Sequence, residues 1–308
     1  MRKWFFNILI YLSLIFLVVY LFRYNYVDLK GIRFNYWYLS LSCILLWIGF
    51  IASALAWRKC LVLHNMPVSG VKAVVSHGLS VFAKFIPGKV WVVLGRASKV
   101  SSEGVSLKTA SYASLKEQLV YIWLGLALGS FFLLFQNGNW ELLLIVFTLF
   151  LGLTVFNLSD WFRRLVALAY KKITKHEFDI PRISAKEIIA LAGSVAIYWV
   201  LWSAGFWFFT KSIIADISPF VAFAFPLSVT LGLLAIIVPG GLGVREGLMV
   251  VGLTALGTPI DVAATISIAA RLWFLSGEIF IFLLGLSINI SQKRCLQRLN
   301  TDNADITD

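Results

Sequence analysis

The sequence predicts an all-α polytopic integral membrane protein with about 6–8 transmembrane helices. Hydrophobic residues make up 60% of the 308 residues and charged residues 14%, against about 45–50% and about 25% in soluble domains. The apolar residues gather into runs of about 20 residues, the length at which a helix crosses a bilayer. This composition excludes a soluble enzyme, a disordered chain and a secreted disulfide scaffold.

The charge and the metal-binding residue types narrow the function further. The net charge is +12, from 27 Lys and Arg against 15 Asp and Glu. Most of the basic residues lie between apolar runs, so we attribute them to cytoplasmic loops that hold the topology, and not to nucleic-acid binding. The three cysteines and three histidines are scattered without metal-ligand spacing. We therefore expect no metal, no cofactor and no disulfide framework.

The spans follow one another with short connections. Residues 4–22 follow a basic start and have no small-residue cleavage site, which predicts an uncleaved first helix. We expect further spans at 36–57, 119–135, 140–158, 188–210, 220–238, 244–257 and 262–290, although 220–257 could instead dip into the bilayer and return.

The remaining segments set the domain and its orientation. Residues 58–104 are ambiguous, while the basic segment 159–187, interrupted by Pro181, is expected to be solvated. We expect one membrane domain over 1–295 and a polar, disordered tail over 296–308. If the spans alternate, most basic segments fall on one side, which predicts the cytoplasmic (inner) membrane with both termini in the cytoplasm. Tyr and Trp residues such as Trp57 are expected to be interfacial anchors.

Two broken segments, 71–118 and 228–273, resemble each other. Each has an apolar run, a Pro-Gly pair, a short apolar piece with an arginine, a polar break and a charged small-residue helix. Pro87 precedes Glu117 by 30 residues, and Pro239 precedes Arg271 by 32. Because the two units are expected to run in opposite directions, they predict an inverted repeat.

The Pro-Gly breaks are candidate binding sites. Proline removes a helix donor and glycine admits unusual backbone angles, and lipid tolerates such backbone only where it is buried in protein or lines a wet cavity. Freed amides and half-helix N-termini can bind an anion. The alternative is a simple interfacial turn. The candidate substrate-binding residues here are Pro87, Gly88, Lys89, Arg96, Pro239, Gly240, Gly241 and Gly243.

Charged residues near the second break are further candidates. Arg271 lies inside an apolar run, where an arginine costs roughly 2.5–3.5 kcal/mol, and Glu278 lies seven residues later on the same helix face. We expect the two to support each other through a third group, with snorkelling or packing as the alternative. Arg245 and Glu246 could brace the glycine turn or face a headgroup. Lys89 and Arg96 could equally be ordinary cytoplasmic charges, and His77 is expected to be a packing residue.

The segment Val238-Pro239-Gly240-Gly241-Leu242-Gly243-Val244-Arg245-Glu246-Gly247 resembles the lysylphosphatidylglycerol synthase transmembrane-domain (flippase-like) family. Residues 85–91 and Arg96 are similar to the first block of that family, and the resemblance covers about 1–295. In bifunctional members such a domain moves an aminoacylated phospholipid to the outer leaflet, and a soluble C-terminal domain makes the lipid. These 308 residues contain no counterpart of the soluble domain, so we expect no enzymatic activity. Stand-alone relatives are linked to lipid-linked sugars beside glycosyltransferases.

The resemblance thus implies a lipid flippase or transporter. Its cargo would be an anionic or lipid-linked (aminoacyl- or glycosyl-) phospholipid or a polyprenyl phosphate. The alternative is a non-catalytic subunit that anchors or assists a glycosyltransferase in cell-envelope biosynthesis. The expected partners are membrane lipids and a glycosyltransferase or lipid-modifying enzyme. No nucleotide-binding GxxxxGK[ST] loop occurs, so the driving force is expected to be a gradient, the membrane potential or downhill scrambling.

Overall fold

The computed structural model describes residues 33–85, 90–101, 105–136, 140–235 and 243–305. Every regular element within these ranges is a helix, which confirms the predicted fold class. The expected span 4–22 lies outside the described residues. Among the described residues, the helices long and apolar enough to cross a membrane are α2 (Tyr36–Leu63), α5 (Leu107–Leu134), α6 (Trp140–Leu158), α8 (Ala185–Lys211) and α11 (Ile260–Asp305).

The shorter helices form two helical hairpins within the bundle. The first consists of α3 (Gly70–Ser80), the 3-10 helix η1 (Val81–Phe85) and α4 (Val90–Ser101). The second consists of the 3-10 helix η2 (Pro219–Phe223), α9 (Ala224–Leu234) and α10 (Val244–Ala255). The four α-helices have 11 or 12 residues each. Even with the adjoining 3-10 helices, the entering helices over 70–85 and 219–234 are shorter than the about 20 residues that cross a hydrocarbon core of about 30 Å.

Close approaches show how α9 and α10 pack. Gly252 of α10 faces Ala224 at the start of α9, and Gly232 near the end of α9 faces Arg245 at the start of α10. The two helices are therefore antiparallel neighbours. Because both are shorter than a spanning helix, the structure favours the alternative in which this segment dips into the bilayer and returns.

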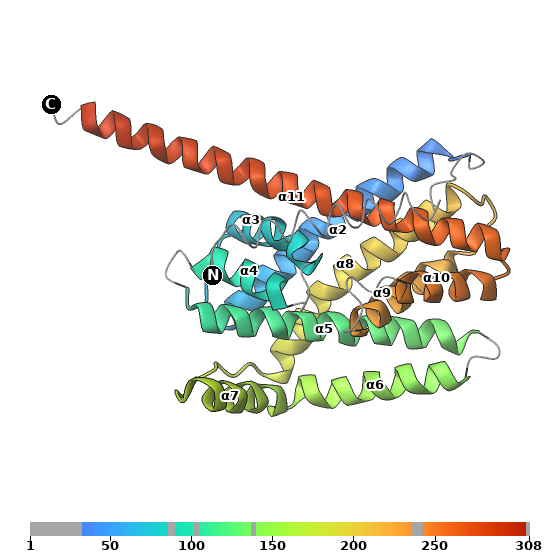
Figure 1. The fold of residues 1–308 in the computed structure, drawn as a ribbon, viewed down its shortest axis with the longest axis horizontal. Helices are drawn as coiled ribbons and strands as arrows, with labels where there is room; N and C mark the ends of the chain where they lie inside the picture. Colours follow the sequence, from blue (N-terminus) through green and yellow to red (C-terminus); the bar gives the residue numbers. More distant parts are fainter. Residues whose placement is uncertain (1–32, 86–89, 102–104, 137–139, 236–242, 306–308) are drawn as a thin grey trace.

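The ambiguous segment 58–104 is the counterpart of this hairpin. Helix α2 continues to Leu63, and α3 and α4 then pack against each other, with Gly95 facing Ser80. Figure 1 places this hairpin at the opposite end of the bundle from α9 and α10. The two hairpins thus lie at opposite ends of the bundle.

The two halves of the chain are related as the predicted inverted repeat. Helices α2 to α5 correspond to α8 to α11, and α5 and α11 run in opposite directions along the bundle (Figure 1). Helices of one half pack against helices of the other half, in an exchange of partners: α3 lies against α11, α9 against α5, and α2 against α8. Small residues permit the exchange. A side chain at Gly78 of α3 would collide with the carbonyl oxygen of Ile281, and one at Gly129 of α5 would lie 2.8 Å from Leu227 of α9.

The predicted solvated segment 159–187 is in part helical, and its side chains are mostly exposed. Helix α7 (Trp161–Thr174) follows directly after α6 and ends where Lys175 adopts a left-handed backbone with φ of 61°. Pro181 lies in the non-helical stretch between α7 and α8, so the segment is not one continuous helix, as predicted. Helix α8 then begins with a capping box, in which Ser184 and Glu187 satisfy each other's backbone donors.

Helix α11 continues across the predicted domain boundary at residue 295 and ends at Asp305. The part of the predicted tail before residue 306 is therefore helical. The division of the chain into a membrane domain over 1–295 and a tail over 296–308 stays a prediction.

Candidate functional site

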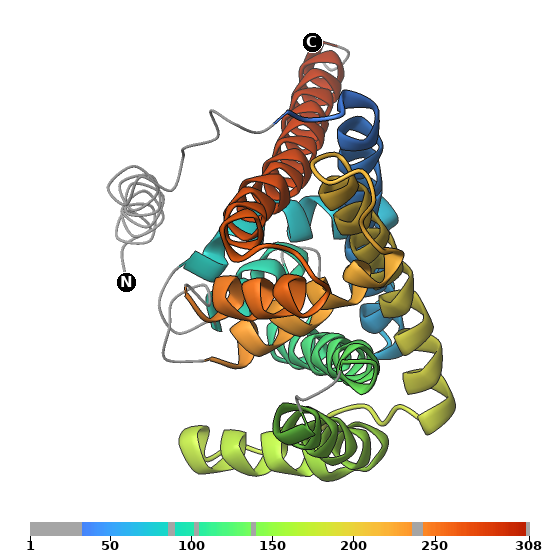
Figure 2. The same cartoon turned by 90° about the vertical axis from the view of Figure 1, so that its right-hand side faces the viewer.

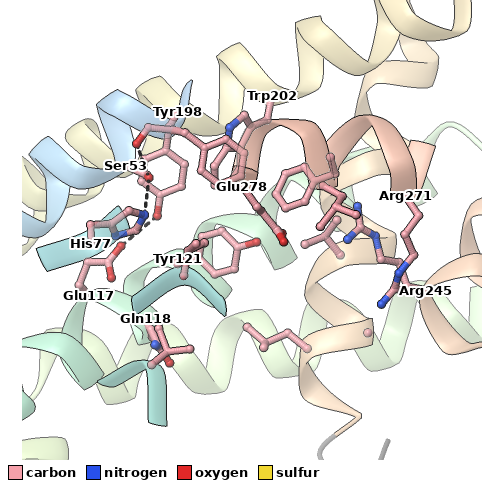
Figure 3. A pocket seen from close by; sticks show the side chains of 18 of the residues that line it. Ser53, His77, Glu117, Gln118, Tyr121, Tyr198, Trp202, Arg245, Arg271 and Glu278 are labelled. Carbon is pink, nitrogen blue, oxygen red and sulfur yellow. Dashed lines mark hydrogen bonds between the residues drawn. The ribbon is translucent and has the colours of Figure 1, made fainter. Parts of the chain in front are cut away.

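A cavity of about 250 Å³ lies between the two hairpins, in the middle of the bundle. Its wall comes from both halves of the chain, including the long helices α2, α5, α8 and α11. Figure 3 shows Ser53, His77 and Glu117 at one end, and Arg245 and Arg271 at the other. The polar and charged residues that line it are Ser53, His77, Arg96, Glu117, Gln118, Tyr121, Tyr198, Arg245, Arg271 and Glu278.

One end of the cavity is held by a buried ion pair between α4 and α5. Nη2 of Arg96 lies 2.7 Å from Oε2 of Glu117, and the two side chains are 3% and 7% exposed. The guanidinium also donates to Oγ and, at 2.8 Å, to the carbonyl of Ser114, and it lies 4.4 Å from the ring centre of Trp57. The hydroxyl of Tyr198 donates to Oε1 of Glu117 over 3.2 Å. A buried pair is tolerated when its remaining polar atoms are satisfied, as they are here.

The other end carries a second ion pair, between α10 and α11, with the signs of the charges exchanged. Glu246 of α10 accepts from Nη1 of Arg271 through Oε1. Its Oε2 accepts from the backbone amide of Gly243 over 2.6 Å and so caps α10. The pair is less buried than the first, with side chains 13% and 22% exposed. In each half of the chain, an ion pair therefore ties the returning short helix to the long helix that follows.

Arg245 differs from the other two arginines because it forms no ion pair among the described residues. Its guanidinium carbon lies 5.4 Å from the ring centre of Phe225 and 5.0 Å from that of Phe274. Such cation–π contacts compensate part of the cost of removing the charge from water. Nη2 is buried and has no hydrogen-bond partner within the described ranges. Nη2 therefore offers two N–H donors at the cavity, and the guanidinium group that carries them stays positively charged.

The structure brings four of the predicted site residues together. Arg96, Arg245, Arg271 and Glu278 all line the cavity. Glu246 reaches it through Arg271, and its bond to Gly243 is the brace of the glycine turn that the sequence suggested.

The structure gives Arg271 a direct partner from another helix, Glu246, which lies 25 residues away in the sequence. The expected mutual support of Arg271 and Glu278 through a third group stays a prediction. The interpretation of Arg96 as an ordinary cytoplasmic charge is wrong, since this residue is 2% exposed and ion-paired. The predicted residues Pro87, Gly88, Lys89, Pro239, Gly240 and Gly241 lie outside the described residues.

Sequence reasoning missed several cavity residues of other types. Trp57, Tyr198 and Trp202 were grouped with the interfacial aromatic anchors, but all three are buried, and Tyr198 and Trp202 line the cavity. His77 was expected to be a packing residue at the interface, yet it lines the cavity and its Nε2 lies 3.2 Å from Oγ of Ser53. A useful signal was the unusual density of ring-bearing residues inside the span 188–210, well away from its ends.

Comparison with known proteins identifies the family. The family model described as "Lysylphosphatidylglycerol synthase TM region" matches residues 4–285. No curated protein and no solved structure matches the chain. The matched region includes both hairpins and every residue that lines the cavity. The chain therefore belongs to the lysylphosphatidylglycerol synthase TM region family.

Proposed function

We propose that this membrane protein is a lipid flippase or transporter, which moves an anionic or lipid-linked phospholipid or polyprenyl phosphate across the cytoplasmic membrane. It moves the lipid intact and is not an enzyme. The single observation that carries this proposal is Arg245, a buried arginine with an unpartnered N–H group at a cavity inside a membrane protein. Ionisable residues at membrane depth commonly mark substrate pathways.

A phosphate group suits this end of the cavity. The planar guanidinium of arginine matches the oxygen atoms of a phosphate, and it remains charged when buried. Arg245 can donate through Nη2 without giving up an ion pair, because it has none among the described residues. Arg271 lines the same end and adds positive charge, part of which Glu246 compensates.

The size and walls of the cavity favour a headgroup over a whole lipid. Its volume of about 250 Å³ is slightly below the usual range for small-molecule sites, about 300–1,000 Å³. Aromatic side chains of Phe50, Tyr121, Trp202 and Phe274 supply apolar and stacking surface. The headgroup would therefore enter the cavity while the acyl or prenyl chains stay in the bilayer.

The inverted repeat supplies a route for alternating access. In transporters with such repeats, the site lies near the bilayer midplane at the repeat interface, and one repeat rocks against the other. Here the cavity lies between hairpins at opposite ends of the bundle, and each hairpin packs on the long helix of the other half. Opening one hairpin at a time would expose the cavity to one leaflet at a time.

The test is lipid movement in proteoliposomes that contain the purified chain. Fluorescent phosphatidylglycerol, phosphatidylethanolamine and a polyprenyl phosphate are the probes, and reduction of outer-leaflet fluorophores reports the movement. We expect the wild type to move at least one phosphate-bearing lipid faster than empty vesicles, and Arg245→Gln to lower this rate at least ten-fold. Arg182→Gln, which removes the same charge from an exposed loop position, is the matched control and should match the wild type. Wild-type rates equal to those of empty vesicles for all probes would refute the proposal.

A further inference from the structure

Helix α7 lies across the bundle, whereas the spanning helices run along it. In Figure 2, where α6 is seen end-on, α7 is seen along its length. Figure 1 shows it foreshortened, at the end of the bundle where α6 terminates. A helix that is perpendicular to a spanning helix at the end of that helix lies parallel to the membrane surface.

One face of α7 is apolar and exposed. Trp161, Leu165 and Leu168 are 67%, 58% and 65% exposed, and their i, i+4, i+7 spacing places them on one stripe. The opposite side is fixed by packing, because Val166 and Ala167 pack against the cluster of Tyr112, Phe162 and Ile180, and the ring centre of Tyr170 lies 5.2 Å from that of Phe178. The stripe is therefore held outward and has no role in the packing of the described residues.

The stripe continues an apolar surface that already faces lipid. Val155 and Leu158 in the last turn of α6 are exposed, and Trp161 begins α7 three residues after Leu158. Since α6 is the spanning helix with the smallest buried fraction among those described, its exposed side chains contact the hydrocarbon of the bilayer. The apolar stripe of α7 extends this lipid contact from the spanning helix α6 to a helix that lies in the plane of the membrane interface.

Cations without acidic partners lie beside the stripe (Arg164, Lys175) and at its C-terminal end (Lys172). Arg163 donates to Asp160 over 3.3 Å, which lowers the pKa of that carboxyl, and Lys171 pairs with the exposed Glu177. Arg164, Lys172 and Lys175 have no ion pair among the described residues. These three cations would lie at the height of lipid phosphates if the stripe were inserted.

We propose that α7 is an interfacial helix that binds anionic phospholipids of the leaflet on its side of the membrane. Trp161, Leu165 and Leu168 insert between the upper parts of the acyl chains, and Arg164, Lys172 and Lys175 contact phosphate groups. Amphipathic helices with this division of faces bind through apolar burial and attraction to anionic lipid. This surface is separate from the cavity, so the proposal does not depend on transport.

The depth of the stripe can be measured with a fluorophore. An NBD group is attached at Leu168→Cys, or at Lys171→Cys as the matched control on the same helix, in a full-length variant whose native cysteines are replaced. The protein is placed in phosphatidylcholine nanodiscs with phosphatidylglycerol. We expect nitroxides on the acyl chains to quench the group at position 168 and aqueous iodide to quench the group at position 171. Equal iodide quenching at both positions would overturn the proposal, because the stripe would then face water and be open to a protein partner.

Selectivity for anionic lipid is measured at the same position. We expect nitroxide-labelled phosphatidylglycerol to quench NBD at position 168 more strongly than labelled phosphatidylcholine. Since each basic residue near the surface contributes about 1 kcal/mol, or about five-fold, Arg164→Gln with Lys172→Gln should lower this preference several-fold. Lys293→Gln with Arg294→Gln removes two exposed cations from α11 and should leave it unchanged. Equal quenching by the two lipids in the unmodified helix would overturn the anionic selectivity.

Discussion

The ion pair between Arg96 and Glu117 gives a sharp test of how the first hairpin is held. Glu117→Gln keeps the shape of the side chain but leaves the Arg96 guanidinium without its counter-charge, at a position where the two side chains are 3% and 7% exposed. Removing one partner of a buried pair costs about 3–5 kcal/mol, because the other charge stays buried and uncompensated. Replacing both partners by uncharged residues of similar volume costs much less.

The expected result is therefore non-additive. The unfolding midpoint of purified Glu117→Gln in detergent should fall by about 10 °C, from the roughly 2–4 °C per kcal/mol of proteins with about 150–250 residues. The double variant Arg96→Met with Glu117→Gln should lie closer to the wild type. Glu246→Gln, at the more exposed second pair, should lower the midpoint less, because water screens that charge. A single variant as stable as the wild type, or a double variant less stable than the single one, would refute the reasoning.

Two further predictions concern packing and orientation. Gly78→Leu should separate α3 from α11 and lower the unfolding midpoint, because the new side chain meets the carbonyl oxygen of Ile281. The control is Gly152→Leu, at a position with open space around it. Equal midpoints for the two variants would contradict the packing argument. A cysteine at Lys293, in a variant without native cysteines, should react with a membrane-impermeant maleimide only after the cells are broken, since we propose a cytoplasmic C-terminus; labelling in intact cells would contradict that orientation.

The long spans were predictable because the bilayer imposes one simple requirement. A spanning helix needs about 20 apolar residues, so the predicted run 140–158 coincides with α6, and 188–210 falls within α8. The interruptions between the short helices were also predictable, because a Pro-Gly pair disfavours a continuous helix within an apolar run. What the sequence left open was whether 220–257 crosses twice, since two half-length helices and two short spans have similar compositions.

The pairs and the interfacial helix were harder to predict, for physical reasons. The partner of Arg271 is 25 residues away on another helix, and periodicity along one helix cannot reveal it. Helix α7 was assigned to solvent because its cations lower its average hydropathy. Its apolar residues are spaced for a helix that is half inserted, a pattern that a search for spanning runs does not detect.

The two ion pairs also bear on how the proposed movement could proceed. Each short returning helix is tied to the long helix of its own half by an ion pair, while the entering helix of the same hairpin packs on the long helix of the other half. A hairpin therefore bridges both halves, and rocking of the halves must strain one of these two contacts.

The glycine-mediated contacts are uncharged, and small sliding movements there expose no charge. Breaking an ion pair is the more costly step, and it is less costly for the partly exposed Glu246–Arg271 pair than for the buried Arg96–Glu117 pair. In the arrangement described here, the end of the cavity beside α10 is thus the one closer to opening, and the free N–H group of Arg245 lies at that end.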